Sequence, residues 1–165
     1  MSSKEASLSE WVHTSFKQLS VAATNLNAVS DELGKSIAVL DSALKKLNLG
    51  VSTWVAINDG ETPDGSFYWS EDIGYDKINN KWGIAIRAVS GHYQDPDNEH
   101  CESWLFSDAP RRLRIPAVAK IPDLLDKLGK ETDTMAKKIK EKTEQAEQLA
   151  AIINNAASES GAKRK

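Results

Sequence analysis

Two long stretches of the chain repeat apolar residues at alternating spacings of three and four. In the first stretch only Ser30 interrupts the apolar series, which is Val12, Phe16, Leu19, Ala23, Leu26, Ser30, Leu33, Ile37, Leu40, Leu44 and Leu47. In the second, Thr132 and Lys142 interrupt the series Ile121, Leu125, Leu128, Thr132, Met135, Ile139, Lys142, Ala146, Leu149, Ile153 and Ala156. A repeat sustained over about five heptads is typical of coiled-coil helices.

These repeats predict a helix within residues 1–50 and another within residues 116–157. Each apolar series forms one stripe of eleven positions along its helix, which we call the seam, and both helices border the same middle segment. We therefore expect the two helices to pair antiparallel within one chain, with Leu47 near Ile121 and Leu19 near Leu149. Further apolar residues lie off the seam, and burying them predicts a homodimer through the helices; they are Leu8, Trp11, Ala22, Val29, Ala150 and Ile152. Residues 158–165 are expected to form a disordered basic tail.

The middle segment, residues 51–115, has the period of two that is typical of β-strands. Trp82, Ile84 and Ile86 alternate with small or polar residues after Asn79-Asn80, and asparagine tolerates the positive φ that a two-residue hairpin turn requires. Further strands are expected at 51–57, 66–72 and 101–106, separated by polar loops at 58–65 and 91–100. The predicted fold class is α+β: a five-stranded antiparallel β-meander, the head, inserted between two long helices that pair as an antiparallel coiled coil.

Charge divides the chain in the same way as the apolar pattern. The net charge is −3 overall, but the first 50 residues are neutral, residues 51–115 carry −5 and the remainder carries +2. The acids of the two polar loops have no Lys or Arg beside them; they are Asp59, Glu61, Asp64, Asp95, Asp97 and Glu99. An acidic cluster attracts a basic surface. We hypothesise that a basic partner protein docks on these loops, with Tyr93 as an aromatic anchor; the alternative is that the acids only keep the head soluble.

Arg111, Arg112 and Arg114 precede an expected helix and are candidates for binding a phosphate or carboxylate. Together with the Lys-rich second helix (Lys137, Lys138, Lys140 and Lys142) they support an alternative function as a nucleic-acid-associated regulator. The acidity of the head disfavours that function, because phosphate neutralisation supplies much of nucleic-acid affinity. The simpler interpretation of the arginines is that they neutralise the acidic middle segment.

Metal-ligating residue types crowd residues 92–101: His92, Asp95, Asp97, Glu99, His100 and Cys101. Their spacing matches neither an EF-hand loop nor a zinc pattern with paired cysteines, so a solvated hairpin loop is the favoured interpretation and a weak divalent-cation site the alternative. The sequence contains no Gly-rich phosphate loop, nucleophile elbow or H-E-x-x-H motif. We therefore expect a protein that is not an enzyme and has no cofactor, with a metal-dependent enzyme as the third possibility.

A single cysteine, the lack of an apolar leader at the N-terminus and the lack of a long apolar run together predict a cytoplasmic protein that makes no membrane contact. The expected function is non-enzymatic: a protein-interaction, scaffold or regulatory protein with a β head on a coiled-coil stalk.

Overall fold

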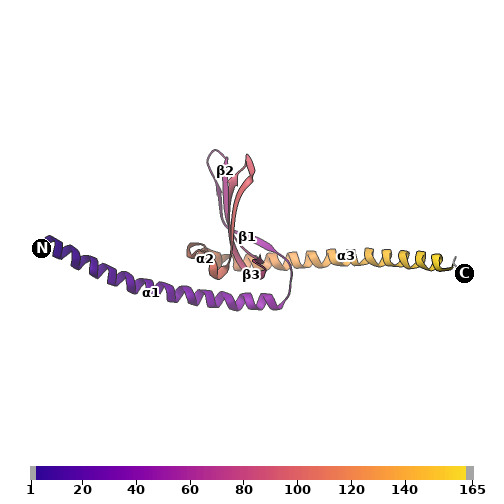
Figure 1. The fold of residues 1–165 in the computed structure, drawn as a ribbon, viewed down its shortest axis with the longest axis horizontal. Helices are drawn as coiled ribbons and strands as arrows, with labels where there is room; N and C mark the ends of the chain where they lie inside the picture. The colour runs from indigo at the N-terminus through magenta and orange to yellow at the C-terminus, as the bar shows by residue number, and fades with distance from the viewer. Residues whose placement is uncertain (1–2, 163–165) are drawn as a thin grey trace.

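The computed structural model describes residues 3–162 as an α+β fold with two long helices and one antiparallel sheet (Figure 1). The helices are α1 (Ser3–Lys46), α2 (Arg111–Ala117) and α3 (Ile121–Ala162), and short 3-10 helices, η1 (Phe106–Asp108) and η2 (Val118–Lys120), flank α2. The strands are β1 (Thr53–Glu61), β2 (Phe67–Ile78), β3 (Lys81–His92) and β4 (Asp95–Leu105).

The sheet is a meander of four strands, in the order β1-β2-β3-β4, with every neighbour antiparallel. The predicted hairpin turn is confirmed: Asn79 and Asn80 have φ of 47° and 65° and join β2 to β3. The prediction of five strands is wrong. Phe67–Ile78 form one continuous strand rather than two, because Asp72 stays paired with Arg87 across the expected break.

The polar loop expected at 91–100 is mostly strand. β3 continues to His92 and β4 begins at Asp95, so only Tyr93 and Gln94 form the turn. The loop expected at 58–65 is likewise shortened, since β1 continues to Glu61. Polar residues occupy these strand ends because they lie beyond the helices and remain exposed on the sheet surface.

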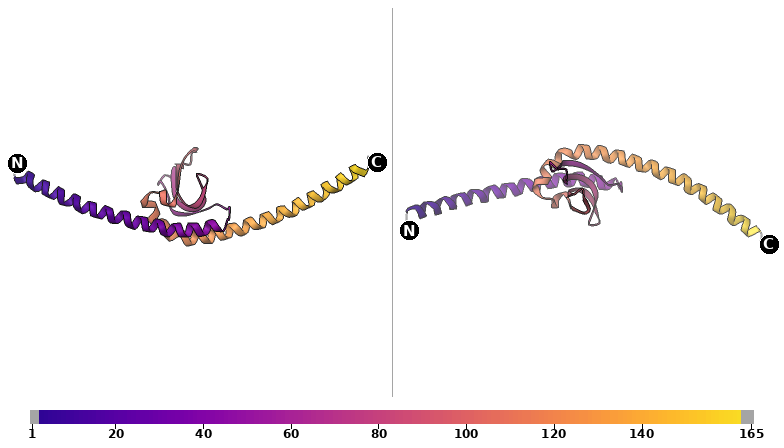
Figure 2. Two further views of the ribbon diagram at one scale, coloured as in Figure 1. Left: turned by 60° about the horizontal axis from the view of Figure 1, so that its bottom comes forward. Right: turned by 90° about the horizontal axis from the view of Figure 1, so that it is seen from above.

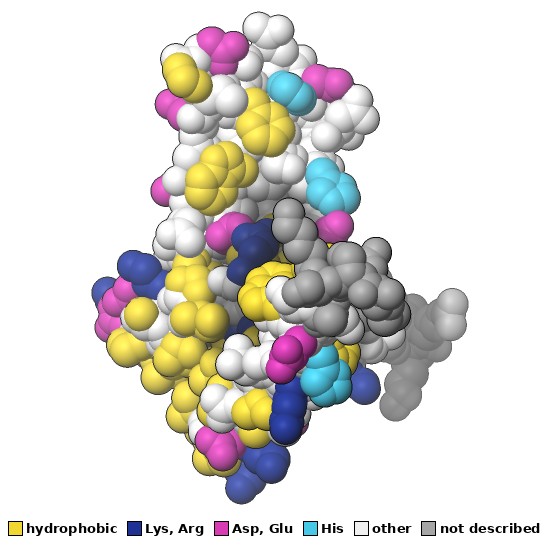
Figure 3. All heavy atoms as spheres, turned by 90° about the vertical axis from the view of Figure 1, so that its left-hand side faces the viewer, with side chains coloured by type: hydrophobic (Ala, Val, Ile, Leu, Met, Phe, Trp, Pro, Cys, Tyr) yellow, Lys and Arg dark blue, Asp and Glu magenta, His cyan; other side chains and the backbone are white. Residues whose placement is uncertain are grey.

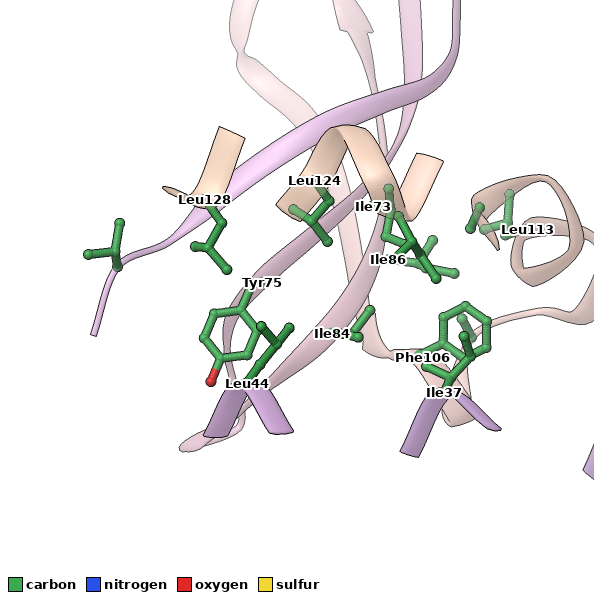
Figure 4. Packing of buried hydrophobic residues seen from close by; sticks show 14 residues of the cluster. Ile37, Leu44, Ile73, Tyr75, Ile84, Ile86, Phe106, Leu113, Leu124 and Leu128 are labelled. Carbon is green, nitrogen blue, oxygen red and sulfur yellow. The ribbon is translucent and has the colours of Figure 1, made fainter. Parts of the chain in front are cut away.

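The hydrophobic core lies where the lower half of the sheet meets α1 and α3 (Figure 4). Figure 4 shows side chains of α1 and of α3 approaching the strands from opposite sides. The core combines Ile37 and Leu44 of α1, Ile73 and Tyr75 of β2, Ile84 and Ile86 of β3, and Leu124 and Leu128 of α3, with Phe106 and Leu113 closing one end. Each helix thus buries part of its apolar stripe against the sheet.

A hydrogen bond from the sheet backbone also ties α1 in place. Asp41 Oδ1 accepts the backbone N–H of Ile84 at 2.7 Å, and its other carboxylate oxygen pairs with Lys45 at 2.6 Å. Pairing of β3 with β4 ends at Ala85 and Leu105, so the carboxylate binds the β3 backbone where that pairing stops. Gly83 leaves the room, because a Cβ there would lie 3.0 Å from the Asp41 carboxylate.

The two long helices do not form the intrachain antiparallel coiled coil that the sequence predicted. In Figures 1 and 2 both run in the same direction, side by side only near the sheet, and the described ends of the chain lie at opposite ends of the molecule. The predicted partners Leu19 and Leu149 therefore lie far apart and are 63% and 60% exposed. The physical reason is that the sheet and α2 lie between the helices and bury the C-terminal part of α1 and the start of α3 themselves.

Two boundaries also differ from the expectation. Residues 158–162 continue α3 rather than forming a disordered tail, and residues 163–165 lie outside the described part of the chain. The chain enters α2 at Arg111, inside the segment assigned to the head. Within residues 3–162, no helix is both long enough and apolar enough to cross a membrane.

Candidate partner-binding surface

The upper half of the sheet projects away from the helices and ends in the two predicted acidic segments (Figure 1). The β1–β2 connection and the β3–β4 turn meet at this end, because β2 and β3 are equally long and their hairpin pairs Phe67 with His92. We call this end of the sheet the distal surface. It contains the exposed acids Asp59, Glu61, Asp64, Asp95, Asp97 and Glu99, together with Tyr68, Trp69 and Tyr93.

Tyr93 joins the two segments. Its backbone N–H donates to the carbonyl oxygen of Ser66 at 3.1 Å, and its hydroxyl donates to Glu61 Oε2 at 3.3 Å. Its side chain nevertheless remains 57% exposed. The structure therefore brings Tyr93 together with Glu61, as the docking hypothesis requires, and leaves the ring accessible.

Tyr68 is a component of this surface that the sequence did not single out as a site residue. Its ring packs against that of Tyr93, with centroids 4.8 Å apart and planes tilted by 43°, and its hydroxyl donates to Glu99. Tyr68 stands opposite Gly91, and a Cβ on that glycine would collide with the phenol. The aromatic residue thus covers a glycine on the neighbouring strand, which fixes the position of the ring.

Both phenols keep their protons well above neutral pH. The hydrogen bond to Glu99 raises the pKa of Tyr68, and partial desolvation, reinforced by Glu61, raises the pKa of Tyr93. Each ionised tyrosine would lie beside a carboxylate, which is unfavourable. The pair therefore offers two neutral rings flanked by carboxylates, which is an arrangement that suits a cationic side chain.

Asp64 and Asp95 of the distal surface form hydrogen bonds with neighbouring residues of the chain. Asp64 accepts hydrogen bonds from the hydroxyls of Thr62 (2.6 Å) and Ser66 (2.7 Å), which lower its pKa to about 2. Asp64 is therefore primarily a turn-forming residue. Asp95 accepts a hydrogen bond from Asn98 at 2.7 Å, within the first residues of β4.

The distal surface has one sign of charge. No Lys or Arg occurs from residue 51 to 76 or from residue 88 to 110, which are the segments that supply this end of the sheet. In Figure 3 the upper part of the molecule shows acidic, aromatic and histidine side chains, and the basic side chains lie below. Arg87 is the basic residue of β3 that lies nearest to the distal surface along the chain. It forms an ion pair with Asp72 at 2.8 Å and lies over the ring of Trp54.

The three arginines predicted to bind an anion lie in α2, where two of them contact α1 and the third contacts β2. Arg111 donates to Asn27 of α1 at 3.0 Å, Arg112 pairs with Glu71 of β2 at 2.6 Å, and Arg114 donates to Ser30 of α1 at 3.1 Å. These contacts hold α2 against α1 and the sheet. The lysines that the nucleic-acid alternative requires lie on the part of α3 that extends away from α2 (Figure 1).

The metal-ligating residue types do not converge. Within residues 3–162, no group of three or more His, Cys, Asp or Glu side chains is arranged to hold a metal ion. His100 instead contacts Glu102 at 3.0 Å, and the exposed Cys101 contacts Ser103. Comparison with protein-family models, curated proteins and solved structures finds no match to this chain.

Proposed function

We propose that this protein is a non-enzymatic interaction protein, and that the distal surface of its sheet binds a partner protein with a basic surface. One observation carries the proposal: the two acidic segments meet at one projecting end, around a packed tyrosine pair of which Tyr93 is exposed, in sequence that lacks Lys and Arg. The negative electrostatic field of such a surface increases the association rate with a positively charged partner. The tyrosines supply the aromatic area that dominates many interfaces.

A triple variant tests the electrostatic part of this proposal. Asp95→Asn, Asp97→Asn and Glu99→Gln remove three charges while keeping side-chain size and hydrogen-bond acceptors. The matched control removes three charges from α3 instead, through Glu141→Gln, Glu144→Gln and Glu147→Gln. The partner is isolated from the native host by pull-down with wild-type protein and identified by mass spectrometry.

The association rate of each variant with the purified partner is then measured over a range of salt concentrations. We expect the triple variant to associate several-fold more slowly and to lose most of its salt dependence, whereas the control retains the wild-type rate. Tyr93→Ala should mainly increase the dissociation rate, because an anchor acts after encounter. Unchanged kinetics in both distal variants would leave the acids with the role of keeping the sheet soluble.

We also propose that the protein is a homodimer assembled through its long helices, which makes it a scaffold presenting two distal surfaces. The support is the large apolar area on both helices beyond the sheet, which a monomer leaves in water. Sedimentation equilibrium tests this proposal, and an 18.1 kDa species at high micromolar concentration would contradict it. An exposed free thiol at Cys101 suits a reducing compartment, so we place the protein in the cytoplasm.

A further inference from the structure

Beyond the sheet, the side chains of both long helices are mostly exposed, although α2 still reaches α1 close to the sheet, where Arg111 donates a hydrogen bond to Asn27. We call residues 7–29 the α1 arm and residues 133–161 the α3 arm. Every residue of the α3 arm is exposed, and so is every residue of the α1 arm except Ser15. The exposed residues include large apolar ones, among them Trp11 (67%), Phe16 (71%), Leu19 (63%), Leu149 (60%) and Ile153 (65%).

The α1 arm is a poor candidate for a helix that stands alone in water. Its sequence is rich in Ser, Thr, Asn and Val, which are weak helix formers. It also has few charged residues with which to form helix-stabilising pairs; Glu10 and Lys17 are the only Asp, Glu, Lys or Arg within it. Most helical stability in proteins comes from packing an apolar face rather than from intrinsic propensity, and the apolar face of the α1 arm is largely exposed. A partner for this arm is therefore needed.

The directions of the helices identify that partner. α1 and α3 run the same way, and their arms leave the sheet on opposite sides (Figures 1 and 2). A two-fold axis perpendicular to the molecule's length exchanges the two sides and reverses the direction of the second copy. It therefore lays the α3 arm of one copy along the α1 arm of the other, antiparallel, and does so twice.

The apolar stripes face the right way for this arrangement. In Figure 4 the α1 and α3 side chains of the core point toward each other from opposite sides. On each helix the stripe that meets the sheet continues into the arm at the same heptad spacing: Ile37 leads back to Phe16 and Leu19, and Leu128 leads on to Leu149 and Ile153. Within one chain, the stripes of α1 and α3 face each other with the sheet between them. In the two-fold dimer, the stripe on the α1 arm of one copy faces the stripe on the α3 arm of the other copy.

We propose that the occupant of each arm is the opposite arm of a second copy of this chain. The seam predicted within one chain then forms between two, with Leu19 beside Leu149, Phe16 beside Ile153, and the small Ala23 beside the small Ala146. This proposal rests on the homodimer proposed above and specifies which surfaces form it. Both arms bend to the same side of the sheet in the view from above (Figure 2), so the two sheets can lie on opposite sides of the paired arms.

The exposed seam residues supply a large share of the area that a stable dimer needs. Eight large seam residues per chain lie on the arms and are 41–71% exposed: Val12, Phe16, Leu19, Leu26, Met135, Ile139, Leu149 and Ile153. At roughly 60–120 Å² of apolar area for a full aliphatic side chain, the exposed parts of sixteen such residues cover roughly 550–1,100 Å² before any flanking contacts are counted. Stable protein interfaces bury about 1,200–2,000 Å² in total.

Disulfide cross-linking with single cysteines tests the proposal. In a Cys101→Ser background, Leu19→Cys and Leu149→Cys are made as separate proteins, oxidised alone, and oxidised after mixing and subunit exchange. We expect neither protein to cross-link alone, and the mixture to give a disulfide-linked dimer on a non-reducing gel. The matched controls are Val21→Cys and Ala151→Cys, which point away from the seam in the heptad register and should not cross-link in any combination.

Several results would overturn the proposal. Cross-linking of either single variant with itself would show that like arms pair, and a ladder of higher species from the Leu19→Cys/Leu149→Cys double variant would show an open chain of copies. Absence of cross-linking in a mixture that sediments as a dimer would place the interface elsewhere. Phe16→Asp provides an independent check: it should convert the dimer to monomer while the tryptophan fluorescence of the sheet persists. A dimer that survives Phe16→Asp would refute arm exchange, and partner binding at the distal surface does not depend on any of these outcomes.

Discussion

Leu124 and Leu125 are neighbours on α3 with opposite environments, and replacing each with alanine tests how this helix packs. Leu124 is fully buried against the sheet, whereas Leu125 is 44% exposed. The heptad register places Leu125 on the seam, and the structure buries Leu124 in its place. The two substitutions delete the same atoms, so the difference between their effects reports burial alone.

We expect Leu124→Ala to lower the free energy of unfolding by about 2–5 kcal/mol, since the lost transfer free energy adds to the cost of the cavity left behind. For a chain of this size that corresponds to a fall of roughly 4–20 °C in Tm. Leu125→Ala should cost well under about 1 kcal/mol, because most of the deleted surface was already in contact with water.

Urea unfolding followed by tryptophan fluorescence is the suitable assay, because Trp82 and Trp104 pack against the core, whereas helical circular dichroism is dominated by the arms. All proteins must be compared at one concentration, since self-association changes apparent stability. Equal midpoints for the two variants, or a larger loss for Leu125→Ala, would refute the packing of α3 on the sheet.

Substitutions at two further residues test individual contacts. Asp41→Ala should cost about 1.5–3 kcal/mol, because it removes a charged acceptor from the backbone N–H of Ile84, and Asp41→Asn should restore part of that loss in the same urea assay. Thr62→Val should raise the pKa of Asp64 from about 2 toward 3.8 in an NMR titration, because the Thr62 hydroxyl is the main cause of the depression. A carboxyl whose pKa is lower in the folded chain than in the unfolded chain stabilises the fold at pH values above its unfolded pKa. In the wild-type protein, Asp64 should therefore contribute its full stabilisation above about pH 4 and lose it as the pH falls toward 2. An Asp64 pKa that is unchanged in Thr62→Val would contradict this assignment.

The sequence patterns predicted the two long helices and the hairpin turn, because these features depend on residues close together in the chain. The seam spacing identified both long helices, and Asn79-Asn80 identified the hairpin, because left-handed backbone at two successive residues suits asparagine. The direction of α3 relative to α1 could not be predicted, because a helix repeat shows which stripe is covered but not what covers it. At the start of α3, packing on the sheet buries Ile121, Leu124 and Leu128, so the buried spacing is three and then four, whereas the predicted seam through Leu125 has four and then three.

The candidate site was predicted only in part, for a similar reason. The acids and Tyr93 were visible as two polar segments without basic residues. The two acidic segments meet at one end of the sheet because β2 is a single long strand. The sequence pattern predicted two strands here, with a break after Asp72. Tyr68 was missed for the same reason, although counting outward from the Asn79-Asn80 turn places it opposite Gly91, a glycine that an aromatic neighbour would cover.

Small-angle X-ray scattering across a concentration series tests the exchange of arms most directly. In the arrangement that we propose, each arm lies along the arm of the second copy, so the two chains occupy nearly the same length. The mass should double with rising concentration while the maximum dimension stays close to that of a single chain. A maximum dimension that grows with the mass would indicate end-to-end association and contradict the account.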